Sequence, residues 1–253
     1  MIGELFDSTI PFGEPELLKA SAYKRFFLEE LEFDTLSQGP NTQRAQLSES
    51  LQADLGRFEQ RGEGSEPVEV VAACIRHSSR VTIYFQCSDR VVPLTIFPHE
   101  QLVHCPLDMP EFIKRHVREL RVMHLEPATL RPPGDPMREL IGETRLHHPL
   151  APVLWALALR GPRRELLPEI AGPAVYRVSP AFELAGLPLN GAVRAAISKL
   201  RREATSLSAL AGWPAFDRER ATRLLNALYL QAGLIVSRSH PSAVRDSWFG
   251  GRS

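Results

Sequence analysis

The chain has 253 residues, of which 43% are hydrophobic and 24% charged, and its formal net charge at pH 7 is zero. These values are typical of a globular protein with enough apolar side chains for a sizeable core, and they exclude global disorder. The longest apolar runs, residues 68–75 and 153–159, fall far short of the roughly 18 to 20 residues that cross a bilayer, so we expect no membrane span.

The beginning of the chain is acidic rather than basic. Glu4 and Asp7 precede the first basic side chain, Lys19, which is the wrong charge order for a secretory or transit peptide. The cysteines have no Cys-x-x-Cys spacing and lie in apolar runs, as reduced thiols of a core do. These cysteines are Cys74, Cys87 and Cys105. The sequence therefore predicts a cytoplasmic protein of the bacterial type.

Charge is distributed unevenly along the chain. Residues 1–66 carry 6 basic and 13 acidic side chains, a net charge of −7. From Arg194 to the end there are 10 basic and 4 acidic side chains, a net charge of +6. Opposite charges of this size steer association at low salt, so the two ends are candidate contact regions.

Two helices are predicted ahead of the first strand. In residues 14–36, Pro15 suits a first helical turn and apolar residues recur at near-helical intervals. A second helix follows, with a narrow apolar stripe from Leu47 to Phe58. Residues 61–67 are rich in glycine and charge, which predicts a flexible connection.

The strongest strand signal comes next, and it predicts an antiparallel meander of three or four strands. The β-branched and aromatic runs are residues 68–75, 81–87, 91–97 and, less extended, 122–125. Between the last two runs, Asp108 stands three residues ahead of Glu111 and before an apolar helical stripe, so it is expected to cap a helix that packs on the sheet.

A proline-rich segment separates two predicted domains. Prolines crowd residues 129–149, which we interpret as a connection between an α+β domain at 1–128 and a helical domain at 150–253. The second domain opens with a buried helix at residues 152–159, and a short strand is expected at 175–178.

The last eighty residues alternate helices with one strand. The predicted elements are helices at 190–202, 206–211 and 217–232, with Asp217 as N-cap and Gly233 as the C-terminal stop, followed by a strand at 234–236 that leads into a wing. Apolar residues at Leu207, Leu210, Phe216, Leu224, Leu225 and Leu228 would form its core. This order resembles bacterial winged-helix domains. The resemblance implies that residues 217–232 are a recognition helix that binds nucleic acid.

A helical wheel of residues 217–232 gives a mixed outer face. Ala221, Leu224, Leu225, Leu228 and Ala232 define the expected buried face. Outward residues then include Arg223 and Asn226, which suit a DNA groove, and Glu219 and Leu230, which do not. The candidate nucleic-acid contacts are Arg218, Arg220, Arg223, Asn226 and, in the wing, Arg238. Leu230 is the candidate contact for a protein partner.

Motifs for catalysis and metal binding are not found. The run from His99 to His104 resembles the zinc-protease motif His-Glu-x-x-His, but it is one residue too long, which places the two imidazoles on different helical faces. There is no Gly-x-Ser-x-Gly elbow and no phosphate-binding glycine loop. We therefore expect no metal, no cofactor and no enzymatic activity.

The acidic residues 14–58 have three interpretations. Their helices can cover the sheet, because an open sheet needs one face buried. They can instead dock on a partner, or pair with the basic C-terminal half of a second copy in a homo-oligomer.

The sequence thus predicts a non-catalytic bacterial regulatory or adaptor protein that acts through protein contacts. The alternative is a transcriptional regulator that binds duplex DNA through the winged-helix-like domain. A second alternative is an enzyme whose site is assembled from distant residues, which leave no local motif.

Overall fold

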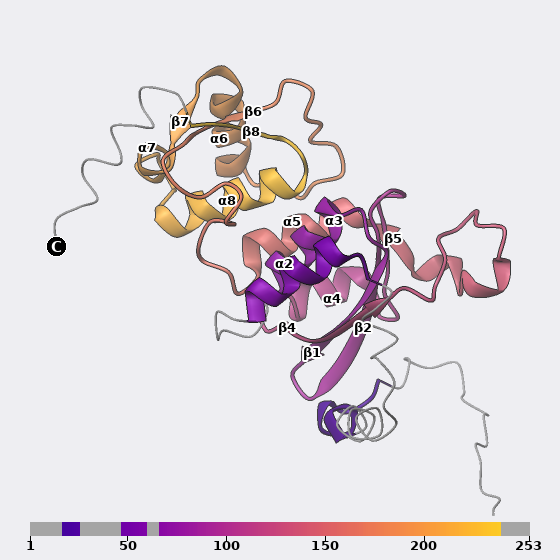
Figure 1. Ribbon diagram of the computed structural model, residues 1–253. Helices are drawn as coiled ribbons and strands as arrows, with labels where there is room; N and C mark the ends of the chain where they lie inside the picture. The colour runs from indigo at the N-terminus through magenta and orange to yellow at the C-terminus, as the bar shows by residue number, and fades with distance from the viewer. Residues whose placement is uncertain (1–16, 26–46, 60–65, 239–253) are drawn as a thin grey trace, which may run out of the picture.

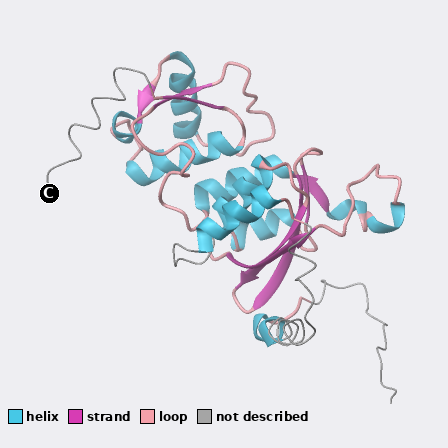
Figure 2. Ribbon diagram, in the orientation of Figure 1, coloured by secondary structure: helices cyan, strands magenta, loops and turns pink. Residues whose placement is uncertain are grey.

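The computed structural model describes residues 17–25, 47–59 and 66–238. These residues form two lobes: helices stacked on one face of an antiparallel sheet, and a smaller lobe of helices with a three-stranded sheet (Figure 1, Figure 2). The mixed helix and antiparallel-sheet composition confirms the predicted α+β class. None of the described helices is long and apolar enough to cross a membrane.

The larger sheet has five strands in the order β4-β1-β2-β3-β5, and all its pairings are antiparallel. The strands are β1 (Val81–Cys87), β2 (Arg90–Phe97), β3 (Leu102–His104), β4 (Arg121–Pro127) and β5 (His147–Pro149). The expectation of three or four strands was therefore too low. The two strands missed have only three residues each, too few to show an alternation of apolar and polar side chains.

The run at residues 68–75 is a helix, so the prediction of a strand there was wrong. Helix α3 (Pro67–Arg76) begins with a proline, and its residues from Pro67 to Cys74 are all buried. A helix buried all round has no polar face, so its apolar run cannot be distinguished from a buried strand by periodicity. Pro67 is the local signal that favours the helix, because its missing N–H is tolerated only in the first turn.

Helices α2 (Glu49–Glu59), α3, α4 (Met109–Arg115) and α5 (Leu150–Arg160) cover one face of this sheet (Figure 1). Helix α2 confirms the second predicted helix, and the Asp108 side chain caps α4 by accepting the Glu111 N–H at 3.0 Å. Of the first predicted helix, residues 20–25 are helical and the remainder lies outside the described residues. Most of the predicted linker at 61–67 also lies outside them.

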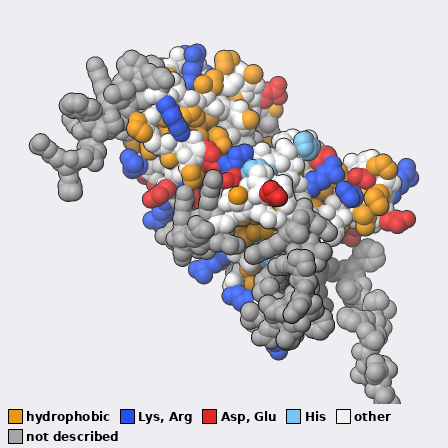
Figure 3. Space-filling view, viewed as in Figure 1, with side chains coloured by type: hydrophobic (Ala, Val, Ile, Leu, Met, Phe, Trp, Pro, Cys, Tyr) orange, Lys and Arg blue, Asp and Glu red, His pale blue; other side chains and the backbone are white. Residues whose placement is uncertain are grey.

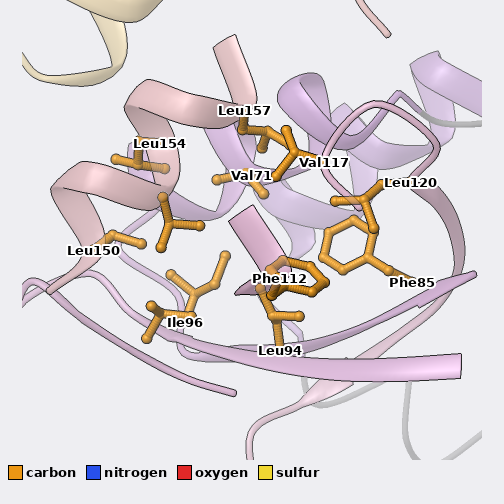
Figure 4. A pocket seen from close by; sticks show the side chains of 12 residues that line it. Val71, Phe85, Leu94, Ile96, Phe112, Val117, Leu120, Leu150, Leu154 and Leu157 are labelled. Atoms are coloured by element: carbon orange, nitrogen blue, oxygen red, sulfur yellow. The ribbon is translucent and has the colours of Figure 1, made fainter. Parts of the chain in front are cut away.

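The space between sheet and helices is filled by apolar side chains. Phe85, Leu94 and Ile96 of the sheet face Phe112 of α4 and Leu154 of α5 (Figure 4). The cavity left among them holds about 10 Å³, which is no larger than one water molecule requires. This part of the sheet lobe is a packed core rather than a ligand site.

The chain between β4 and β5 projects from the sheet as an arm (Figure 1). It contains two short 3-10 helices, η2 (Arg138–Leu140) and η3 (Thr144–Leu146). The segment predicted as a proline-rich connection lies between two strands of the same sheet, and its last three residues form the edge strand β5, which pairs with β3.

The smaller lobe contains the predicted helices and strands in the predicted order, together with a two-residue strand that was not predicted. Its sheet has the order β7-β6-β8, and its elements are β6 (Val175–Val178), α6 (Gly191–Arg202), β7 (Thr205–Ser206), α7 (Leu207–Ala211), α8 (Arg218–Leu230) and β8 (Leu234–Ser237). Asn190, Ser206 and Asp217 cap the three helices through side-chain oxygens. Strand β8 pairs with β6, and any wing beyond Arg238 lies outside the described residues.

The C-terminal end of α8 differs from the expectation. Ala232, with φ of 52°, takes the left-handed conformation that usually favours glycine at this position. Gly233 is required for another reason: a Cβ on it would lie 2.6 Å from ring carbons of Phe182. The glycine was therefore correctly placed near the end of the helix, but it serves close packing rather than the turn.

Helix α8 packs against α5, so the hydrophobic core is continuous through both lobes. This contact determines which side chains of α8 remain accessible.

Candidate functional site: an arginine-lined cleft

The nominated base-contacting residue Asn226 is buried, with 1% of its surface exposed. Its Oδ1 accepts the Leu167 N–H at 2.9 Å, and its Nδ2 donates to the Glu165 carbonyl at 2.9 Å. Both ends of the amide are thus used to hold the loop after α5. The wheel placed Asn226 outward, and this placement was wrong because the loop and α5 cover that side of α8.

Arg223 is also occupied within the fold. Its Nη1 donates to the carbonyls of Leu159 and Gly161 at 3.0 and 2.8 Å, and its Nε lies 3.0 Å from Glu219 Oε1. Only 15% of its side chain is exposed. Arg223 therefore closes the C-terminal end of α5, whose last carbonyls would otherwise lack partners.

Leu230 is 7% exposed, so its predicted position outside the core was wrong as well. Helix α8 is buried on its predicted outer face because it is covered on more than one side. Arg218 and Arg220, at the start of α8, are exposed as expected. Arg238 is exposed at the end of β8, where its Nη2 donates to the carbonyls of Glu169 and Ala171.

The nominated nucleic-acid contacts consequently do not form one surface. Arg218 and Arg220 lie at the beginning of α8 and Arg238 after it, whereas the two residues between them face the interior. On the face shown in Figure 3, Lys and Arg side chains are interspersed with Asp and Glu instead of gathering in one broad basic patch.

A cleft of about 860 Å³ lies where α5, α6 and α8 meet. Its walls come from the C-terminal half of α5, the first residues of α6, the turn before α8, and the first half of α8, with Arg118 contributed from the segment after α4. The volume is in the range of small-ligand sites, which is roughly 300 to 1,000 Å³. The cleft is far larger than the cavity in the core of the sheet lobe.

Four arginines line the cleft, and none of its lining residues is acidic. They are Arg118, Arg160, Arg220 and Arg223. Arg223 is tied to carbonyls and to Glu219. Arg220 Nη1 donates to the Ala215 carbonyl at 2.9 Å, and its Nε lies 3.9 Å from Asp217 Oδ2. Within the described residues, no carboxylate forms an ion pair with Arg118 or Arg160. The cleft therefore carries uncompensated positive charge.

The two unpaired arginines influence each other. Burial lowers the pKa of Arg160, and the positive charge of Arg118 lowers it further. Arginine nevertheless keeps its positive charge at neutral pH in proteins. Two like charges in one cleft repel each other, and an anion bound between them offsets the energy of this repulsion.

Next to the arginines the cleft is apolar. Trp155, Leu159 and Phe216 line this part, and the Trp155 Nε1 donates to the Pro188 carbonyl at 3.3 Å, which fixes the ring. The lining contains no histidine, cysteine, serine or carboxylate, so it offers neither a nucleophile nor a proton-transfer group near pH 7. Its chemistry is that of binding an anion that carries an apolar portion.

A second cluster of titratable groups lies at the β3–β5 edge. The rings of His104 and His147 are 4.9 Å apart, and the Nε2 atoms of His147 and His148 are buried without a hydrogen-bond partner among the described residues. Burial first, and then His147 and His148, lower the pKa of His104 to about 4. No group of three or more His, Cys, Asp or Glu side chains in the described ranges is arranged to hold a metal ion.

Comparison with known proteins gives no match to a family model, to a curated protein or to a solved structure. The function must therefore be inferred from the residues themselves.

Arg118 and Arg160 were missed by sequence reasoning. Each follows an apolar helical segment, where a basic residue is common because it complements the helix C-terminus. The two arginines line the same cleft only because of how α4 and α5 pack, and no local sequence pattern predicts this.

Proposed function

We propose that this protein is a non-catalytic regulatory or adaptor protein that binds an acidic segment of a partner protein in the arginine-lined cleft. The observation that carries the proposal is a cleft with four arginines, an apolar wall and no lining carboxylate. Charge complementarity of this kind attracts an acidic partner and excludes a basic one.

Structural features of the smaller lobe support a protein partner over duplex DNA. A recognition helix must expose several side chains along one face to enter the major groove. Helix α8 instead buries Asn226 and Leu230, and the guanidinium of Arg223 is used internally. We propose that the lobe is a winged-helix-like module in which this helix packs inward.

The test is the binding of a fluorescein-labelled peptide of alternating glutamate and phenylalanine, followed by fluorescence anisotropy. The double variant Arg118→Ala/Arg160→Ala should weaken binding at least tenfold, since it removes both unpaired charges. The control Arg218→Ala/Arg238→Ala removes the same charge outside the cleft lining and should change affinity less than threefold.

Equal losses in the two variants would contradict the proposal, because binding would then follow net charge alone. A duplex DNA probe in the same assay addresses the alternative. Binding of DNA that is tighter than binding of the peptide and that depends on Arg218 and Arg238 would also reject it.

A further inference from the structure

The positive charges of the cleft indicate which kind of anion binds there. This inference rests on the proposed function. Arg118 and Arg160 come from different elements, yet they lie close enough for one to lower the pKa of the other. A carboxylate carries one negative charge and leaves one of two such guanidinium groups uncompensated. A phosphate monoester carries about −1.5 to −2 at pH 7 and compensates both.

The donors also favour a phosphate. Guanidinium groups bind phosphate oxygens through paired N–H donors, and a phosphate monoester offers three oxygens for two arginines to share. Arg160 is the last residue of α5 and Arg118 belongs to the segment after α4, so the two arginines reach the same cleft from different elements.

The other groups of the wall leave the ligand to Arg118 and Arg160. Arg223 is held by the carbonyls of Leu159 and Gly161 and is paired with Glu219, so its charge is already compensated within the fold. Helix α6 begins in the same wall, at Gly191 and Ala192, and its N-terminal end adds positive potential to that of the arginines. The lining itself contains no carboxylate.

We propose that the cleft binds a phosphorylated side chain of the partner segment, with the phosphate between Arg118 and Arg160 and a neighbouring apolar side chain against Leu159 and Phe216. The apolar wall makes the site selective for a phosphate attached to an apolar context, because inorganic phosphate alone would leave that wall exposed to water.

The experiment compares three pentapeptides by isothermal titration calorimetry with the full chain: Ala-Leu-Ser-Phe-Ala, the same peptide phosphorylated on serine, and the same peptide with glutamate in place of serine. The phosphopeptide should bind at least tenfold more tightly than the glutamate peptide. This preference should decrease as the pH falls below about 6, where the phosphate becomes a monoanion.

Variants connect the preference to the residues. Arg118→Ala and Arg160→Ala should each remove most of the preference for phosphate, whereas Arg218→Ala should leave it unchanged. Circular dichroism and thermal melting of each variant establish that the fold is intact. If Arg160→Ala does not fold, Arg118→Ala, on an exposed side chain, still decides the assignment.

The outcomes separate this inference from the proposed function. Equal affinity for the phosphopeptide and the glutamate peptide, with both dependent on Arg118 and Arg160, would overturn the phosphate assignment and leave the acidic partner. Binding of neither peptide would overturn both. Adenosine monophosphate that binds more tightly than the phosphopeptide would show that the phosphate belongs to a small molecule, and it would overturn the assignment to a partner segment.

Discussion

Asn226 accepts a hydrogen bond from the backbone N–H of Leu167 at 2.9 Å, and both residues are buried. This bond and the one from Asn226 Nδ2 to the Glu165 carbonyl attach the loop after α5 to helix α8. Leu167 and Asn226 are 59 residues apart in the sequence, so this bond joins two distant segments of the chain.

Asn226→Ala should destabilise the fold by about 2 to 4 kcal/mol, because a buried N–H and a buried carbonyl would both lose their partner. Urea denaturation followed by circular dichroism measures the change. Arg218→Ala on the exposed side of the same helix is the control, and we expect it to stay within about 0.5 kcal/mol of the wild type. A similar small effect for Asn226→Ala would show that water reaches these groups.

Arg163 is a second buried link, with 7% of its surface exposed. Its Nη1 lies 2.6 Å from Glu69 Oε1 and 2.5 Å from Glu66 Oε2, so it joins the loop after α5 to the start of α3. Arg163→Met should cost about 3 to 5 kcal/mol, because it leaves the Glu69 carboxylate buried without a partner.

The combination Arg163→Met/Glu69→Gln isolates that charge. Since the glutamine carries none, the double variant should be more stable than Arg163→Met alone in chemical denaturation. If adding Glu69→Gln lowers stability further, the cost of losing Arg163 comes from its other hydrogen bonds and not from the stranded carboxylate.

Leu230 should behave as a core residue. Leu230→Ala should reduce the free energy of unfolding by about 2 to 4 kcal/mol, the usual range for a buried leucine. The measurement is a thermal or urea melt of the purified variant. Ala232→Gly is the control, at an exposed position two residues further on. It should increase the free energy of unfolding, because glycine adopts the left-handed conformation of Ala232 without strain. An unchanged melt for Leu230→Ala would return this residue to the surface and restore its role as a partner contact.

His104 should make stability depend on pH. Its pKa in the folded protein is about 4, against about 6.5 for an unfolded histidine, so the unfolded chain takes up the proton first as pH falls. The stability that neutral His104 contributes is complete above pH of about 6.5 and is lost as the pH falls to about 4. Because the ring is only partly buried, solvent screening limits this loss to about 1 to 2 kcal/mol.

His104→Gln removes this titration and leaves the remaining groups in place. The wild type should therefore lose more stability than the variant between pH 7 and pH 4, as measured by urea denaturation at several pH values. Parallel curves for the two proteins would mean that His104 titrates equally in both states and is not shifted by burial.

Several elements of this fold could be predicted from the sequence because their determinants are local. Asp108 and Asp217 cap helices through hydrogen bonds to an N–H three residues ahead, and the adjacent strands β1 and β2 are joined by a tight turn. Helix α6 likewise follows from its periodicity and the Asn190 cap, and α5 ends at the Gly161-Pro162 pair. In such cases, the groups that decide the structure are neighbours in sequence.

The remainder was decided by contacts between distant segments. Residues 67–74 of α3 are all buried, and an apolar run of this kind has no period that distinguishes a buried helix from a buried strand. Asn226 and Leu230 lie inside because α5 and its following loop cover a second face of α8, whereas the wheel allowed for only one. The cleft has the same origin: Arg118, Arg160 and the start of α8 meet only after the two lobes have packed together, and the sequence records each arginine but not the distance between them.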